Sequence, residues 1–161
     1  MASDVVKLVS RSSGDVELVF VDCYVPEDLP TKVDLPFPYY YLRIGGLIVQ
    51  NFICRPEHCI SDKRGMMLVG VWDCRELTTA GVVAAIDSGN VGLMLVDFER
   101  DLYGVVCRSV GGPIQPGAID ERSVRYDKPI SGVSVQYEVD LVNISLMPLR
   151  GSPVEFLSTS K

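Results

Sequence analysis

The sequence contains a single histidine, His58, and this scarcity limits the catalytic chemistry it could perform. A Ser-His-Asp or Cys-His site would have to use that one side chain, and no nucleophile-elbow motif accompanies it. The glycine pairs at 45–46 and 111–112 form neither a P-loop nor a dinucleotide-binding fingerprint. No two acidic residues stand out as a general acid and base. The sequence therefore carries no standard catalytic motif.

Basic residues and long apolar runs are also scarce. Fifteen Lys and Arg against 21 Asp and Glu give a net charge of −6, which argues against binding along a nucleic-acid backbone, although one basic pocket would suffice for a small nucleotide. No apolar run reaches the roughly 20 residues of a membrane span, and the N-terminus lacks the pattern of a signal peptide. We expect a cytoplasmic or nuclear protein that binds neither nucleic acid nor membrane.

The five cysteines are odd in number and scattered, unlike a disulfide framework, so we expect reduced thiols. Cys54, His58 and Cys59 could supply three zinc ligands, with Cys23 or Cys74 as a fourth. However, their spacing matches no standard zinc motif, and adjacent His58 and Cys59 fit poorly into one tetrahedron. We therefore expect no bound metal and interpret residues 54–59 as a loop with buried thiols.

The apolar residues form short runs that predict a single all-β domain arranged as a sandwich, barrel or jelly roll. The run at 91–96 is continuous and predicts a strand covered on both faces, whereas the alternation at 133–141 predicts a strand with one buried face. One weak helix is predicted within 75–85. The apolar content of 47% suggests that some apolar surface is buried between subunits. Strands are expected at 16–21, 39–44, 66–72, 91–98, 103–107 and 133–141.

Residues 80–98 resemble the third motif of the trimeric dUTPases and the strand that follows it. Gly89, Asn90, Val91 and Gly92 stand in the family's G-N-V-G positions. Residues 14–18, 38–44 and 150–161 resemble further family segments in the same order. The resemblance implies a dUTPase-like β-barrel or jelly roll over residues 1–148, with insertions near 49–66 and 115–131. It also implies a C-terminal arm at 149–161 and a homotrimer.

The departures from the family pattern affect the residues that its chemistry needs. Ala84 replaces the Asp that positions the attacking water, and Asp87 replaces the Tyr that faces uracil. The family's second motif is expected after Ile44 and its fourth motif at 108–113, and neither is present. The Asp of the first motif corresponds to Glu17. The resemblance therefore implies that the chain has no catalytic residues.

Only part of the family's fifth motif is present in this sequence. Arg150, Phe156, Ser158 and Thr159 could still hold a phosphate and stack on a base. Glutamate and leucine on either side of Phe156 replace family glycines that allow a close approach of the backbone to the ligand. These four residues, with Asp87, are the remnant nucleotide-site positions.

Our first functional hypothesis is a non-catalytic dUTPase-fold protein that acts as a protein-interaction or regulatory module. Relatives of this kind in adenoviruses and herpesviruses act on host signalling or defence proteins, so the resemblance implies a host or other protein partner. We expect the interaction surface in the two insertions, near 49–66 and 115–131, because binding specificity often lies in inserted surface loops. The candidate residues, all in the first insertion, are Arg55, Glu57, His58, Lys63 and Arg64.

Two alternatives stay open. A nucleotide hydrolase with a shifted site would use Asp87 as base, Phe156 to stack on uracil, and Arg150 with Ser158 and Thr159 to bind phosphate. Only this alternative needs a cofactor, Mg²⁺. The other alternative is a structural or virion β-protein, whose high apolar content would reflect burial between subunits.

Overall fold

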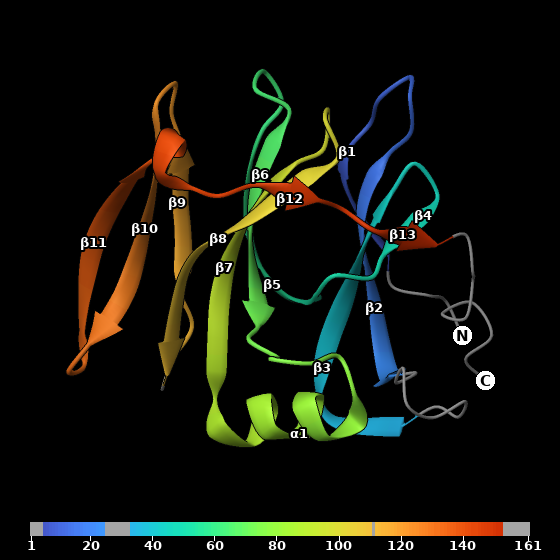
Figure 1. Ribbon diagram of the computed structural model, residues 1–161, viewed down its shortest axis with the longest axis vertical. Helices are drawn as coiled ribbons and strands as arrows, with labels where there is room; N and C mark the ends of the chain where they lie inside the picture. The colour runs from blue at the N-terminus through green and yellow to red at the C-terminus, as the bar shows by residue number, and fades with distance from the viewer. Residues whose placement is uncertain (1–4, 25–32, 111, 153–161) are drawn as a thin grey trace.

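The computed structural model describes residues 5–24, 33–110 and 112–152, and these consist mainly of antiparallel strands (Figure 1). The prediction of an all-β chain is confirmed. The elements in chain order are β1 (Val5–Val9), β2 (Val16–Tyr24), β3 (Val33–Ile44), β4 (Leu47–Val49), β5 (Ile53–Ser61), β6 (Met66–Trp72), α1 (Thr79–Ser88), β7 (Asn90–Asp97), β8 (Leu102–Val110), β9 (Gln115–Ile119), β10 (Ser123–Ile130), β11 (Val133–Asp140), the short 3-10 helix Leu141–Asn143, β12 (Met147–Pro148) and β13 (Gly151–Ser152).

The strands form a large sheet and a small one. The large sheet has the order β1-β2-β3-β5-β6-β7-β8-β12, with β4 beside β3 and β13 beside β4, and the small sheet has the order β11-β10-β9. Residues 144–152, here called the strap, cross the large sheet from one side to the other (Figure 1). The strap pairs with β8 at Met147 and Tyr103 and with β4 at Gly151 and Val49.

The six predicted strands are all present, as β2, β3, β6, β7, β8 and β11. The prediction that the run at 91–96 is covered on both faces is also confirmed, because Val91, Leu93, Leu95 and Val96 are all buried. Two faces of β7 can be buried at once because the small sheet covers one of them and the remainder of the large sheet curves around the other.

The largest buried cluster lies within the curved large sheet. A separate core between the two sheets is built from β6 and β7 on one side and from the segment of β9 and β10 on the other. Leu68, Leu93 and Leu95 pack there with Ile114 and Val124. A third cluster lies under α1, where Val82 and Ile86 meet β3, β4 and β5. Burial of these side chains removes apolar surface from water and is the main term that holds the layers together.

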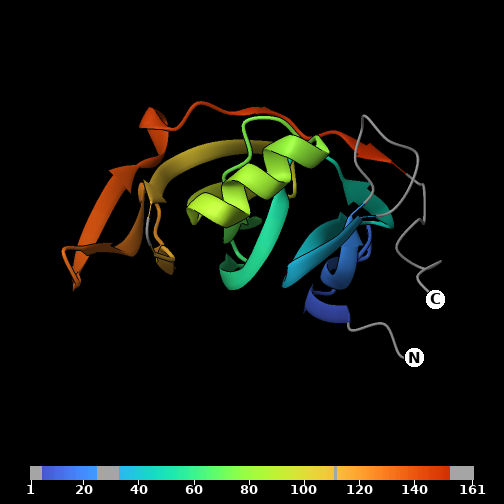
Figure 2. The same ribbon diagram turned by 90° about the horizontal axis from the view of Figure 1, so that it is seen from below.

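Helix α1, the one α-helix among the described residues, covers one end of the large sheet (Figures 1 and 2). It begins after Thr78, whose Oγ1 accepts a hydrogen bond from the backbone N–H of Gly81 at 3.2 Å. It ends at Gly89, which adopts a left-handed conformation with φ 67° that glycine allows at low cost. The predicted helix at 75–85 is therefore correct in kind but begins and ends about one turn too early. Among the described residues, no helix is long and apolar enough to cross a membrane.

The prediction that residues 54–59 form a loop is wrong, because this segment lies within β5, an inner strand between β3 and β6. Arg55, Pro56 and Glu57 interrupt the apolar pattern, which obscured the strand. The ladder with β6 is irregular between Cys54 and His58, and a bulge of this kind tolerates a proline inside a sheet. The second predicted surface loop, near 115–131, likewise consists mostly of β9 and β10.

The prediction that the strand at 133–141 has a buried face is also wrong. Seven of the eight residues of β11 are exposed, and Val139 alone is half-buried. β11 is the outermost strand of the small sheet and lies at the side of the molecule (Figures 1 and 2). An alternating sequence predicts an apolar face but not whether the opposing layer extends far enough to cover it.

Candidate functional site

Two surfaces of the described residues are candidates for a functional site: a groove beside the strap, and the outer strand of the small sheet. The groove comprises two adjoining hollows of about 330 Å³ and about 200 Å³. It lies between the segment 72–78, strand β8 and the strap. Its polar lining consists of Asn51, Asp73, Arg75, Glu76, Thr78, Arg108 and Arg150, and its apolar lining includes Phe52, Met94 and Met147.

The groove is held together by hydrogen bonds from the strap. The backbone N–H of Arg150 donates to Oδ1 of Asn51 at 2.6 Å, and the carbonyl of Arg150 accepts from the N–H of Gln50 at 2.8 Å. Across the groove, Arg108 Nε lies 3.1 Å from Asp73 Oδ1 in an exposed ion pair. Three arginines and two acidic residues therefore meet at a polar, open surface.

Of the remnant nucleotide-site positions, the structure describes two, Arg150 and Asp87, and these lie apart. Arg150 lines the groove beside Thr78, the residue that precedes α1. Asp87 lies in the last turn of α1, nine residues after Thr78, which corresponds to about 13 Å along the helix axis. Ala84 lies on the exposed side of the same helix. The other three positions, Phe156, Ser158 and Thr159, lie outside the described residues.

The five residues predicted as an interaction surface do not form one patch. Arg55 Nε and Glu57 Oε1 pair with each other at 2.8 Å and are largely buried, and the guanidinium of Arg55 lies 4.5 Å above the ring of Trp72. His58 Nδ1 lies 2.8 Å from the carbonyl oxygen of Pro56. These residues are therefore occupied in contacts within the chain.

Lys63 and Arg64 of the same predicted surface lie elsewhere. They are in the turn that joins β5 and β6, between Ser61 and Met66. At about 3.3 Å per residue, eight residues of strand and turn place Lys63 more than about 20 Å of chain beyond Arg55. The structure therefore divides the predicted surface between the ends of β5.

The four cysteines with described side chains are free thiols. Burial raises the pKa of the Cys54 thiol far above its usual value. Burial, together with the negative charge of Asp73, raises the pKa of Cys74 to about 12. The thiolate is the nucleophile and the metal ligand, so such thiols are poorly suited to either role. In the described part of the chain, no three His, Cys, Asp or Glu residues lie close enough to hold a metal ion.

The outer hairpin of the small sheet carries an exposed apolar stripe, formed by β11 and the last residue of β10 and here called the β11 surface. Its residues are Val133, Ile130, Tyr137 and Val135, whose exposed fractions are 64%, 41%, 37% and 36%. In the antiparallel ladder Ile130 is opposite Val133 and Lys128 is opposite Val135. Opposite residues share a face, so the four apolar side chains lie on one side of the hairpin.

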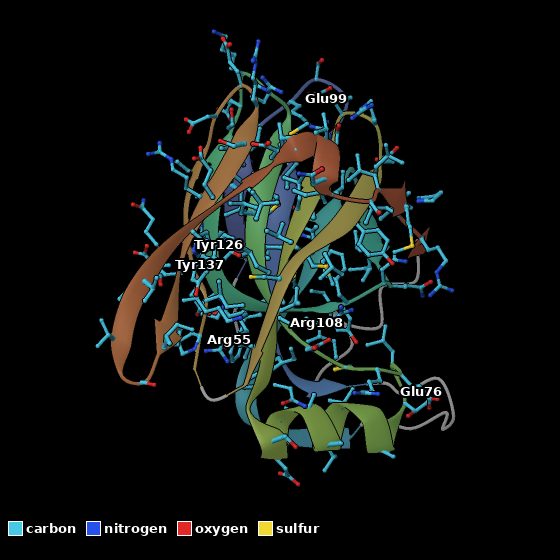
Figure 3. The ribbon with its side chains drawn as sticks, turned by 60° about the vertical axis from the view of Figure 1, so that its left-hand side comes forward. Arg55, Glu76, Glu99, Arg108, Tyr126 and Tyr137 are labelled. Atoms are coloured by element: carbon cyan, nitrogen blue, oxygen red, sulfur yellow. The ribbon has the colours of Figure 1, made fainter. Side chains whose placement is uncertain are left out.

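The hairpin that carries the β11 surface is firmly anchored at its base. Tyr137 stacks on buried Tyr126 with ring centroids 5.5 Å apart and an angle of 12° between the rings (Figure 3). Ser123 Oγ donates a hydrogen bond to Glu138 on the other face of the hairpin. Lys128 Nζ donates to the carbonyl oxygen of Arg108 at 2.9 Å, which ties the tip to β8. The exposed strand is therefore an ordered part of the fold.

Sequence reasoning missed the β11 surface because the alternation of residues 133–141 was interpreted as a face that the domain itself covers. A signal was present, since the polar residues between the valines include no lysine or proline, the residues that commonly protect an exposed strand from pairing. Comparison with protein-family models, with curated proteins and with solved structures finds no match to this chain.

Proposed function

We propose that this chain is a protein-interaction module without nucleotide-hydrolysing activity, built on a β fold related to that of the trimeric dUTPases. The observation that carries the proposal is the β11 surface, whose apolar stripe and outer edge are uncovered in the described part of the chain. An exposed strand edge accepts a further strand through main-chain hydrogen bonds, and the side chains on its face give specificity. The partner is therefore expected to supply an extended segment.

The arrangement around α1 supports the non-catalytic part of the proposal. Hydrolysis of a phosphate ester needs a positioned water and a held phosphate in one site. Ala84 cannot orient water, and Asp87 lies at the end of α1 away from the groove that Arg150 lines. Within one chain, a base at Asp87 would therefore lie at the far end of the helix from a phosphate held at Arg150.

The relation to the dUTPase fold is supported by the roles of the matching residues. Gly89 ends α1 in a left-handed conformation, and Asn90, Val91 and Gly92 begin the buried strand β7. These are structural roles, and a fold keeps such positions when its active site is lost.

Selection from a library of displayed extended peptides tests the interaction function. Immobilised protein is expected to enrich peptides that alternate apolar and polar residues. Their binding should be lost in Val135→Glu and kept in Val135→Thr. The glutamate lies opposite Lys128 and can pair with it, so the variant keeps the hairpin while adding a charge to the stripe. Absence of any peptide whose binding depends on residue 135 would contradict the proposal.

The groove favours one second candidate, the binding of a small anionic ligand such as a nucleotide. Arg75, Arg108 and Arg150 line it, and guanidinium groups bind phosphate well. The test is incubation with dUTP and Mg²⁺, followed by assays of pyrophosphate release and of thermal stability. The interaction-module proposal predicts no turnover and no shift in melting temperature, whereas binding of the nucleotide in the groove predicts a higher melting temperature without turnover. Turnover abolished by Asp87→Ala would instead establish a working hydrolase.

A further inference from the structure

We propose that the β11 surface pairs with the β11 surface of a second copy of this chain, antiparallel, about a twofold axis centred on Gln136. This inference rests on the proposed function of β11 as a strand-accepting edge, and it names the partner. It follows from the edge itself, from the order of the side chains along it, and from the positions of its charges.

The edge strands of the described sheets differ in length and in how they are protected from pairing. β12 and β13 have two residues each, and β9 has five and an irregular ladder. β1 has five residues, an exposed Lys7 and an irregular ladder after that lysine, all of which hinder pairing with another chain. β11 has eight residues and pairs with β10 without interruption from Val133 to Asp140. No described strand lies on its outer side. β11 is therefore the long, regular edge that this protein leaves open.

The side-chain order of β11 is complementary to itself. In an antiparallel pair centred on Gln136, Val135 lies opposite Tyr137 of the second copy, and Val133 lies opposite its Val139. Each of these contacts occurs twice because the arrangement is symmetric. Valine opposite an aromatic residue is a favourable cross-strand pair. A shift by one residue would instead place each valine opposite a polar residue or a glycine, so such shifts are unfavourable.

The same register separates the negative charges. Glu138 lies opposite Ser134 of the second copy, and Asp140 lies opposite Gly132. A register centred on residue 138 or 139 would place acidic side chains against one another, which is unfavourable across strands. Registers centred on Val135 or Tyr137 also keep the acidic side chains apart, but each leaves one valine of β11 opposite a residue outside the strand. The register centred on Gln136 is the one that pairs all four apolar residues of β11 with one another.

A twofold axis perpendicular to the small sheet places the same face of both copies on the same side of the combined sheet. The core side of the small sheet, where Val124 and Tyr126 pack on β6 and β7, is also the side of the β11 stripe. The large sheets of both copies would then lie on that side of the combined sheet and flank the joined stripes. The joined stripes would be partly sheltered from water, which adds apolar burial to the main-chain hydrogen bonds.

The oligomeric state of the full chain tests this inference. Light scattering after size-exclusion chromatography, over a range of concentrations, should give a dimer for the wild-type protein and for Val135→Thr. Val135→Glu should raise the dimer Kd on the order of 100-fold or more, because a carboxylate is buried against Tyr137 at two symmetric places. Circular dichroism should show that the variant keeps its strands. A trimer or a larger assembly that Val135→Glu leaves intact would overturn the inference.

Crosslinking tests the register. A cysteine at Gln136 should meet its own copy across the axis, so Gln136→Cys should form a disulfide-linked dimer under mild oxidation. The wild-type protein with its native cysteines and the Ser134→Cys variant should do so at least about 10-fold more slowly, since residue 134 lies about four residues of strand from its counterpart. Equal crosslinking at both positions would overturn the register. A monomeric wild-type protein that still selects peptides through residue 135 would refute the second copy and leave the proposed function standing.

Discussion

Replacement of Gly104 by alanine is expected to destabilise the protein because the strap crosses β8 at this glycine. A Cβ atom added at Gly104 would lie 2.4 Å from the carbonyl oxygen of Ser145 and 2.8 Å from Cγ2 of Ile144. Real Cβ atoms do not approach a backbone carbonyl so closely, and a carbonyl cannot rotate away as a flexible side-chain end can. Either the strap is strained in place or it moves off β8.

The size of the effect follows from these two responses. Forcing an extra methyl into a packed site costs about 1–3 kcal/mol. Lifting the strap would expose Ile144, which is 6% exposed in the fold, and full exposure of such a side chain costs about 1.5–3 kcal/mol. Because the protein adopts the cheaper response, we expect Gly104→Ala to lower the free energy of unfolding by about 1–3 kcal/mol.

Urea denaturation at one fixed protein concentration, followed by tryptophan fluorescence, measures this change. Gly70→Ala is the matched control, since a Cβ there would meet the movable carboxylate oxygen of Glu57 at 3.2 Å. The control should change the free energy of unfolding by less than about 1 kcal/mol. If Gly104→Ala were as stable as the control, the strap would not cross β8 where the structure places it.

Two further predictions concern buried polar groups. Asp97 accepts hydrogen bonds from the N–H groups of Glu99 and Arg100 and pairs with the Arg100 side chain at 2.7 Å. Asp97→Ala should therefore lower the free energy of unfolding, measured in urea, by about 2–3 kcal/mol. Asp97→Asn keeps an acceptor and should lower it by about half as much. The pKa of Cys74 rises from 9.0 to about 12 on folding, so only the unfolded state loses this proton between those values. The contribution of the protonated Cys74 thiol to the free energy of unfolding should be fully present below pH 9 and should fall above it by up to about 1.4 kcal/mol per pH unit. Cys74→Ser should reduce that slope when denaturation is measured from pH 8.5 to 10.5.

The parts of the fold that could be predicted are those in which the chain supplies its own signal. The apolar run of β7 is continuous, so two covered faces could be inferred before the covering layers were known. Strands β2, β6 and β8 are likewise marked by short runs rich in branched and aromatic residues. Their existence followed from local pattern, whereas their order in the sheet depends on contacts between distant residues.

The strand β5 could not be predicted, because its signal is local but irregular. Arg55 and Glu57 are charged residues on an inner strand. They are stabilised there by pairing with each other and by the stacking of Arg55 on Trp72. A charged pair inside a sheet resembles the sequence of a loop. Only the tertiary partner, Trp72 on the neighbouring strand, distinguishes the two.

The β11 surface could not be predicted for a different reason. Its alternation was recognised, but alternation states only that Val133, Val135 and Tyr137 share a face. The cover for that face is decided by how far the large sheet extends beneath the hairpin, and the fold leaves these residues exposed. The groove was not predicted: Arg150 is the one predicted site residue that lines it, and its other lining residues, such as Asn51 and Arg108, stand in no catalytic or binding motif.

Amide hydrogen exchange of β11 at low and high protein concentration is the most direct measurement of whether this strand pairs with a second copy. If β11 accepts a strand from a second copy, the amides on its outer edge should become protected as the concentration rises in the wild-type protein. They should stay unprotected at every concentration in Val135→Glu, while the amides that face β10 stay protected in both. If exchange of the outer amides were independent of concentration and identical in the two proteins, β11 would not pair with a second copy.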